Sequence, residues 1–193
     1  MSKKYQIILA DPPWEYTLTG STKNARGLAK QNYPEMKLAD IKSLPVKDIK
    51  TDNAMLFLWA TFPMISEALE VITSWGFTYK TAAFIWLKTN PITGKHFWGM
   101  GKYTRANAEV VLLGISNGTK ALTDIKSRSI HQIVECPCQK HSQKPEEVRR
   151  RIELLCGDVP RIELFARVKR SGWDSWGNEI VSDIELGKQG DKG

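Results

Sequence analysis

Cysteine is scarce in this sequence, and long apolar runs are absent from it. The 193 residues include three cysteines, Cys136, Cys138 and Cys156, an odd number at irregular spacing that does not form a disulfide framework. We therefore expect a protein of the reducing cytoplasm. No apolar run approaches the roughly 20 residues of a membrane span, and the N-terminus has no apolar segment long enough for a secretory signal. Repeats and low-complexity segments are also absent, so the composition indicates one ordinary globular domain.

Acidic residues are the minority among the charged ones. The formal net charge is +7 and the isoelectric point is near 9.3, a balance that favours a polyanionic partner such as DNA or RNA. Basic residues gather in three stretches that read as loops, where they could contact phosphates; the alternative is a generally basic, solvated surface. These residues are Lys23, Arg26, Lys30, Lys95, Lys102, Arg105, Lys120, Lys126 and Arg128.

Apolar runs alternate with amphipathic stretches along the chain. Strands are predicted at 5–10, 54–60, 79–87, 108–115 and 161–166, with a short strand at best at 130–135. Helices are predicted at 38–44, 63–75 and 145–155, and long polar loops at 15–31, 89–104 and 116–129. Nearly continuous apolar strands separated by helices predict an α/β sheet covered on both faces. We expect a single domain over 1–186 and a polar, frayed tail over 187–193.

The residues Asp11, Pro12, Pro13 and Trp14 directly follow the first apolar strand. The prolines donate no backbone hydrogen bond and force a tight, extended exit from the strand. A carboxylate, a free proline carbonyl and an indole would then share one rim, at the strand end where open α/β sheets place ligands. Such a set can grip the exocyclic amine of a planar base and stack on its face. The plainer reading is a strand followed by a proline turn.

An ordered series of short motifs carries a family resemblance over almost the whole chain, to about residue 180. The chain resembles the DPPW-type adenine amino-methyltransferases, a family named for the seventy-kilodalton subunit of the eukaryotic messenger-RNA methyltransferase, and in particular its small bacterial and phage DNA adenine methyltransferases. The motifs are Asp-Pro-Pro-Trp at 11–14, Asn-Tyr-Pro-Glu-Met at 32–36, Leu-Phe-Leu-Trp-Ala at 56–60, Tyr-Thr-Arg-Ala-Asn-Ala-Glu at 103–109, His-Ser-Gln-Lys-Pro at 141–145, Arg-Ile-Glu-Leu-Phe-Ala-Arg at 161–167 and Trp-Asp-Ser-Trp-Gly-Asn-Glu at 173–179.

The resemblance implies a Rossmann-like methyltransferase fold with a circularly arranged motif order, S-adenosylmethionine as cofactor, and methylation of the adenine 6-amino group, with DNA ahead of RNA. It implies catalytic roles for Asp11, Pro12, Pro13 and Trp14. For cofactor binding it implies Asp11, Ser142, Lys144, Glu163, Leu164, Arg167, Lys169, Asn178 and Glu179. For substrate binding it implies Trp14, Tyr33, Arg105, Asn107 and Lys144, with Glu109 at the mouth of the site.

Several of these residues also have ordinary structural interpretations. Tyr33 could cover apolar surface, and Arg105, Asn107 and Glu109 could form a salt-bridged strand start. The glycine-rich Phe-x-Gly turn of related enzymes is missing, since Ala166 and Arg167 follow Phe165. The chain has ten residues before Asp11, so we expect modest cofactor affinity or a substituting segment.

A metal site is not expected. Cys136 and Cys138 lie near His131 and His141, but one intervening residue is too few for a zinc knuckle, and such cysteines are more often small buried hydrophobes. Two other function classes compete with DNA or RNA methylation. They are a non-catalytic nucleic-acid binder, disfavoured because Asp11 and Trp14 are present, and an amide methyltransferase, whose motif usually begins with asparagine. Monomer and homodimer both remain open.

Overall fold

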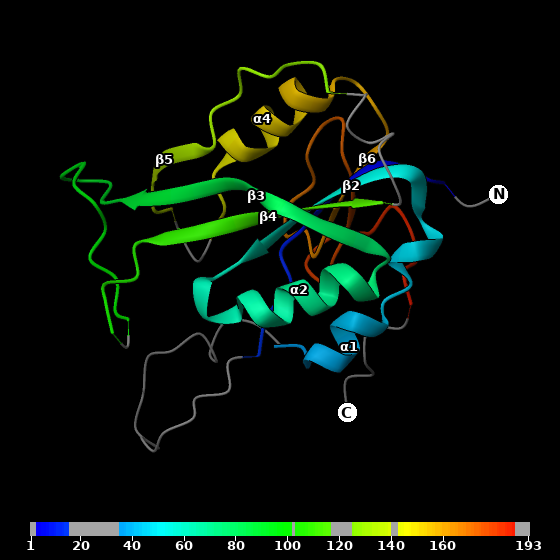
Figure 1. Ribbon diagram of the computed structural model, residues 1–193, viewed down its shortest axis with the longest axis horizontal. Helices are drawn as coiled ribbons and strands as arrows, with labels where there is room; N and C mark the ends of the chain where they lie inside the picture. Colours follow the sequence, from blue (N-terminus) through cyan, green and yellow to red (C-terminus); the bar gives the residue numbers. More distant parts are fainter. Residues whose placement is uncertain (1–2, 16–34, 102, 117–124, 140–142, 188–193) are drawn as a thin grey trace.

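The computed structural model describes residues 3–15, 35–101, 103–116, 125–139 and 143–187. Within these ranges the strands form one mixed seven-stranded sheet in the order β5-β3-β4-β2-β1-β6-β7 (Figure 1). The strands are β1 (Tyr5–Ala10), β2 (Lys50–Ala60), β3 (Phe77–Thr89), β4 (Ala108–Ser116), β5 (Ile133–Pro137), β6 (Arg161–Leu164) and β7 (Asp174–Trp176). β1 is parallel to both of its neighbours, β2 and β6.

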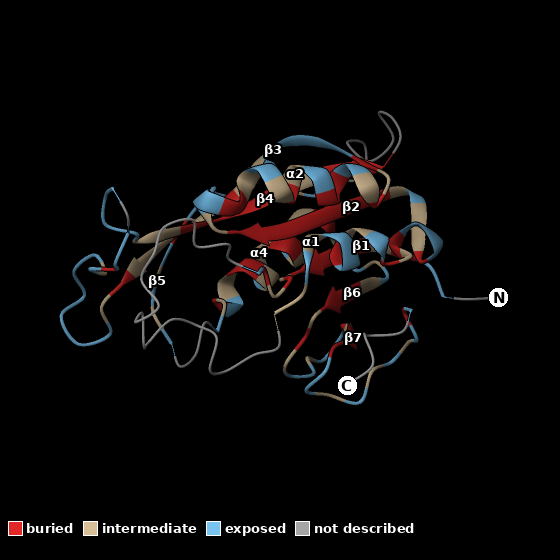
Figure 2. Ribbon diagram, turned by 90° about the horizontal axis from the view of Figure 1, so that it is seen from below, coloured by how far each residue is buried: buried red, intermediate tan, exposed pale blue. Residues whose placement is uncertain are grey.

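Helices cover both faces of the sheet. α1 (Leu38–Ser43) and α2 (Ile65–Ser74) lie on one face and α4 (Glu146–Cys156) on the other, while η2 (Val46–Asp48) and η3 (Phe62–Met64) are single 3-10 turns. Strand alternation divides the core accordingly. In β1, Ile8 and Ala10 face α1 and α2, whereas Ile7 and Leu9 face α4. Figure 2 shows the central strands buried between the two helical layers.

The predicted fold class is confirmed, and most predicted elements are present with shifted bounds. β2 and β3 are longer than predicted, and β5 lies a few residues later than the stretch 130–135. The predicted helix over 63–75 is divided into η3 and α2, and α4 begins at Glu146 with Pro145 as its N-cap. The prediction that β6 continues to Ala166 is wrong, because Phe165 has a φ of 62° and breaks the extended backbone. β7 was not predicted, since three residues show no periodicity.

Strand direction brings distant parts of the chain to one edge of the sheet. The parallel strands β1, β2 and β6 end there, and β4, which is antiparallel to β2, begins there with Ala60 opposite Val110. β3 is antiparallel to β4, so its last residues reach the same edge, with Trp86 opposite Glu109. No helix in the described part of the chain is long and apolar enough to cross a membrane.

Candidate active site

The Asp-Pro-Pro-Trp turn leaves β1 at this edge. The backbone N–H of Asp11 donates to the carbonyl of Leu164 at 3.4 Å, which ties the turn to the end of β6. The carbonyl of Pro12 accepts the N–H of Trp14 at 2.9 Å, and that of Pro13 accepts the N–H of Met36, also at 2.9 Å. The expectation of a free proline carbonyl therefore needs correction. A carbonyl oxygen has two lone pairs, so the Pro12 oxygen can accept one more hydrogen bond.

The indole of Trp14 lies in the core and not on an open rim. Its side chain is 6% exposed, it belongs to the core layer of α1 and α2, and its Nε1–H donates to the carbonyl of Trp59 at 3.3 Å. The expectation that this ring offers its face to a base is not met in this conformation, because stacking requires an accessible face. In this structure Trp14 anchors the turn that carries Asp11.

Four charged side chains from four segments form a continuous row at the sheet edge. Lys144, just before α4, places its Nζ 2.8 Å from Oδ2 of Asp11 and 3.4 Å from Oε2 of Glu109. Lys88, near the end of β3, lies 2.5 Å from Oε1 of Glu109. We call these residues the Asp11–Lys144–Glu109–Lys88 row. Its charges alternate in sign, so each of these largely buried ions has an opposite partner, as burial of charge requires.

Electrostatics keeps the inner members of the row charged. Burial opposes the charged form of Glu109, but the charges and hydrogen bonds of Lys144 and Lys88 outweigh it, so the pKa of Glu109 is lowered. Burial likewise opposes the charge of Lys144, yet Asp11 and Glu109 outweigh it and raise the pKa of that ammonium. Lys144 is therefore a fixed positive charge beside the carboxylate of Asp11.

Two tryptophans form the floor beneath the cations. Nζ of Lys144 lies 5.3 Å from the ring centroid of Trp59, and Nζ of Lys88 lies 5.0 Å from that of Trp86. The two rings meet edge to face, with centroids 6.3 Å apart. Ring faces attract cations in places poor in water, so this floor helps to hold both lysines in position.

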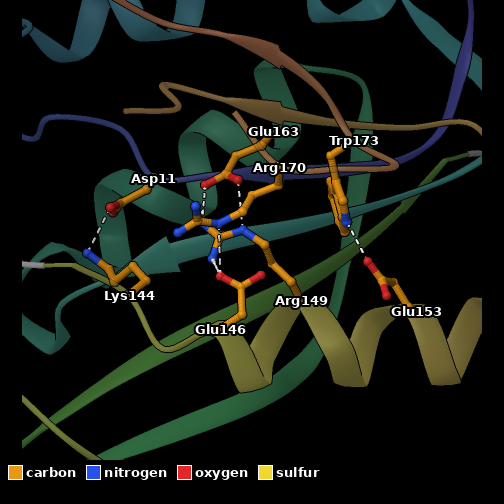
Figure 3. Close-up of polar contacts among 8 residues, drawn as sticks. All are labelled: Asp11, Lys144, Glu146, Arg149, Glu153, Glu163, Arg170 and Trp173. Carbon is orange, nitrogen blue, oxygen red and sulfur yellow. Dashed lines mark hydrogen bonds and ion pairs between the residues drawn. The ribbon is translucent and has the colours of Figure 1, made fainter. Parts of the chain in front are cut away.

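A second ionic cluster lies beside the first, between β6 and α4. Arg149 binds Glu163 with two parallel hydrogen bonds, from Nε to Oε2 at 2.8 Å and from Nη2 to Oε1 at 2.5 Å. Oε2 of Glu146 accepts from Nη1 of Arg149 at 3.1 Å and from Nε of Arg170 at 3.0 Å. Figure 3 shows this cluster next to the Asp11–Lys144 pair; Asp11 directly follows β1, and Glu163 lies on the neighbouring strand β6.

The other predicted cofactor residues lie beyond β6 and differ in accessibility. The side chain of Leu164 is fully buried, so only its backbone is available to a ligand. Arg167 lies 3.6 Å from Glu179, and Asn178 beside it is exposed. Lys169 pairs with Asp183 at 2.5 Å, so its ammonium is already bound on the surface. Among the predicted cofactor residues that the structure describes, Lys144 pairs with Asp11, and the backbone of Asp11 is bonded to Leu164, which follows Glu163 on β6.

The backbone after β6 makes a tight turn without the glycine that related enzymes use. Phe165 adopts the positive φ that usually calls for glycine, and its ring packs edge to face on Trp176 at 5.3 Å between centroids. The backbones of residues 166 and 177 come very close to each other, since a Cβ at Gly177 would lie 2.1 Å from the carbonyl oxygen of Ala166. The missing glycine motif therefore does not mean a missing turn.

Two of the predicted substrate residues, Arg105 and Asn107, lie on the segment between β3 and β4. Arg105 is exposed and its guanidinium lies 4.9 Å from the ring centroid of Trp98, while the carbonyl of Asn107 accepts the N–H of Lys88 at 2.9 Å. Tyr33 and Ser142 lie outside the described residues, as does His141. Within the described ranges, no three His, Cys, Asp or Glu residues gather as a metal site would require.

Sequence reasoning missed Lys88, Arg149, Glu146 and Arg170. Lys88 shares strand parity with the buried Phe84 and Trp86, so alternation along β3 could have placed it on the inner face. Arg149 follows the buried Val148 and lies three positions before the buried Ile152, so the sequence could also have predicted that it faces the sheet side of α4. The partners of Lys88 and Arg149 could not be predicted from the sequence, since the pairing depends on contacts between distant segments.

Comparison with known proteins agrees with this architecture. The model of the MT-A70 family matches residues 5–179. The chain belongs to the MT-A70 family. A Mycoplasma protein named type II methyltransferase M.MunI is 35% identical over 98% of this chain and 84% of its own length. Two eukaryotic MT-A70 relatives are much longer. Human N(6)-adenine-specific methyltransferase METTL4 is 28% identical over 93% of this chain and 38% of its own length. The zebrafish N(6)-adenosine-methyltransferase subunit METTL3 is 26% identical over 92% of this chain and 28% of its own length.

Proposed function

We propose that this protein is an S-adenosylmethionine-dependent methyltransferase that methylates the exocyclic 6-amino group of adenine in DNA. One observation carries the proposal. The carboxylate of Asp11 lies just after β1, ion-paired at 2.8 Å to Lys144, whose side chain is 12% exposed, and beside the strand that carries the buried Glu163. Membership in the MT-A70 family and similarity to the protein named M.MunI support it.

Asp11 and Pro12 would act on the amine. An adenine amino nitrogen is a poor nucleophile because its lone pair is delocalised into the ring. Lys144 engages Oδ2 of Asp11, so we assign Oδ1 to one amino hydrogen and the second lone pair of the Pro12 carbonyl to the other. These bonds draw the nitrogen toward tetrahedral geometry and return the lone pair to it. Asp11 also lies where it can take the proton that the methylated nitrogen must lose. Pro13 and Trp14 would hold the turn rigid.

The residues at the sheet edge fit the proposed cofactor. S-adenosylmethionine carries a ribose diol, an amino group and a carboxylate, and when bound it supplies an electrophilic methyl group. The carboxylate of Glu163 suits the ribose hydroxyls, a common role for an acid at a strand end in nucleotide sites. Lys144 and Asp11 would face the charged methionine part, and the turn from Phe165 to Gly177 would pass close to the adenosine. Arg167, Asn178 and Glu179 would contact its outer side, whereas Lys169 first has to leave Asp183. Ser142 is kept as a cofactor contact on the resemblance alone.

We propose DNA rather than RNA as the polymer that is methylated. M.MunI, whose name identifies a type II methyltransferase, matches over most of its own length, whereas the subunit METTL3 matches over 28% of its length. The net charge of +7 suits either polymer. We propose that Arg105 and Asn107 contact the substrate, and Tyr33 is kept as a substrate contact on the resemblance alone. We further propose one domain over residues 1–186, and a cytoplasmic location, which agrees with three free cysteines.

The deciding experiment is transfer of labelled methyl from S-adenosylmethionine to duplex DNA, single-stranded DNA and RNA. The test variant is Asp11→Asn, and the control is Asp52→Asn, an exposed acid at the opposite end of β2. We expect N6-methyladenine in DNA with the wild type and the control, and a loss of at least about 100-fold with Asp11→Asn. Label on RNA alone would favour the RNA alternative. A folded wild-type protein that labels none of the three polymers contradicts an enzymatic role and favours a non-catalytic binder.

A further inference from the structure

A row of exposed large side chains lies on the segment between β3 and β4. We call residues 90–107, apart from Lys102 outside the described ranges, the β3–β4 arm; it extends beyond the strand ends as the green excursion in Figure 1. Trp98 is 74% exposed, Met100 85% and Tyr103 88%. Large apolar and aromatic side chains are normally buried, and a group of them exposed on one segment is typical of an interaction site.

The arm is an ordered structure at its base. The N–H of Phe97 donates to the carbonyl of Lys88 at 2.8 Å, and that of Asn90 to Lys95 at 2.8 Å. Two glycines let the outgoing and returning backbones touch. A Cβ at Gly99 would lie 2.0 Å from the carbonyl oxygen of Ala106, and one at Gly101 would lie 2.1 Å from that of Thr104. The exposed rings therefore project from a narrow, closely packed fold of the chain.

The charge of this segment is of one sign. From residue 71 to residue 108 the sequence contains no aspartate or glutamate, whereas Lys95 and Arg105 both lie within the arm. The guanidinium of Arg105 lies 4.9 Å from the ring centroid of Trp98, so cation and indole form a mixed platform. Two copies of this chain meeting through their arms would bring like charges together. A polyanion would not, and bases stack on aromatic faces beside cations.

The position of the arm relates it to the proposed active site. Its base is Lys88 and Asn107, which share a backbone hydrogen bond, and Lys88 pairs with Glu109 in the Asp11–Lys144–Glu109–Lys88 row. We propose that the β3–β4 arm binds the nucleic-acid strand next to the target adenine, with Trp98 and Tyr103 stacking on bases and Lys95 and Arg105 contacting phosphates. This inference rests on the proposed function, since it takes the polymer at Asp11 to be nucleic acid.

The test measures binding separately from methylation. Fluorescein-labelled duplex DNA, single-stranded DNA and RNA are titrated with wild type, Trp98→Ala, Tyr103→Ala and the control Tyr79→Ala, whose half-exposed ring lies near the opposite end of β3. We expect Trp98→Ala and Tyr103→Ala each to weaken binding roughly 10-fold, with thermal stability and S-adenosylmethionine binding unchanged. Lys95→Ala should lower the slope of log K against log salt by about one.

The outcomes separate failure of the arm from failure of the function. If the wild type methylates DNA and both ring variants bind DNA as the wild type does, the arm inference is overturned and the function stands. If the wild type methylates no polymer but Trp98→Ala weakens binding, the arm inference holds and the function fails. If the wild type binds neither DNA nor RNA, both fail. If sedimentation shows a wild-type dimer that Trp98→Ala dissociates, the arm joins copies of the chain and the inference is overturned.

Discussion

Arg149 of α4 holds both carboxylate oxygens of Glu163 on β6, at 2.8 and 2.5 Å. Both side chains are about nine-tenths buried, at 11% and 10% exposed. A carboxylate has about four lone-pair directions, and the guanidinium occupies two. The other two keep a fixed direction, so we expect Arg149 to orient Glu163 toward the cofactor that we propose for it.

Replacing Arg149 by lysine should keep the charge but lose the two-pronged geometry. We expect the dissociation constant of S-adenosylmethionine to rise roughly 10-fold with little change in kcat, because the substitution changes the orientation of the Glu163 carboxylate. Calorimetric titration and steady-state kinetics measure the two effects. The matched control is Arg150→Lys, whose guanidinium binds Glu147 on the exposed side of the same helix. Equal cofactor binding by Arg149→Lys and wild type would contradict the positioning role.

Removing the charge of Arg149 should affect the fold itself. In Arg149→Met the carboxylate of Glu163 stays buried without its partner, and we expect a loss of about 3–5 kcal/mol in the free energy of unfolding. The double variant Arg149→Met with Glu163→Gln should recover part of this loss, since no uncompensated charge remains. Urea denaturation of both variants checks the coupling, and strictly additive effects would argue against it.

Lys144 should be essential for methyl transfer. Its ammonium is the cation at 2.8 Å from Asp11, so Lys144→Met leaves that carboxylate without its fixed partner. We expect the single-turnover rate to fall about 100-fold, the scale seen when one preorganised electrostatic contact is removed. Lys144→Arg should restore part of the rate because the charge returns with a different shape. The control is Lys42→Met, a surface lysine paired with Glu70. A rate unchanged in Lys144→Met would remove Lys144 from the site.

Glu109 should make stability depend on pH on the acid side. Its pKa is lowered in the folded protein from an ordinary value near 4.5, because Lys144 and Lys88 outweigh the effect of burial. Its stabilising contribution is therefore present above about pH 4.5 and is lost as pH falls below that value toward the lowered pKa. We expect Glu109→Gln to flatten this part of the curve of unfolding free energy against pH. The exposed substitution Glu185→Gln is the control. A wild-type slope retained in Glu109→Gln would contradict this linkage.

At position 165, glycine should give a more stable protein than alanine. Its φ of 62° lies in the left-handed region, which costs roughly 1–2 kcal/mol for a residue with a Cβ. Both Phe165→Gly and Phe165→Ala lose the ring contact with Trp176, so comparing them isolates the backbone effect. We expect Phe165→Gly to be more stable than Phe165→Ala by about 1 kcal/mol in urea denaturation. The opposite order would mean that the turn relaxes to another conformation.

Local pattern carried much of the fold. The apolar run of β1 and the prolines after it act on their own backbone, so the strand over 5–10 and the turn at 11–14 were predictable from sequence alone. The ordered motifs likewise pointed to the family that the comparison confirmed. Prediction was less accurate where long-range contacts decide the structure. The bounds of β5 were shifted and β7 was missed, because these short segments are strands only through pairing with β3 and β6.

The alternating elements, the rigid turn at Asp11 and the family could all be predicted from the order of the amino acids. Which charges meet depends on how the elements pack. Asp11, Lys88, Glu109 and Lys144 lie far apart along the chain, and they form one row because strand direction and register bring their segments to the same edge. Packing also buries Trp14 and brings Arg149, among three consecutive arginines, to Glu163. Ion pairing and burial depend on distances between segments, and no local periodicity contains those distances.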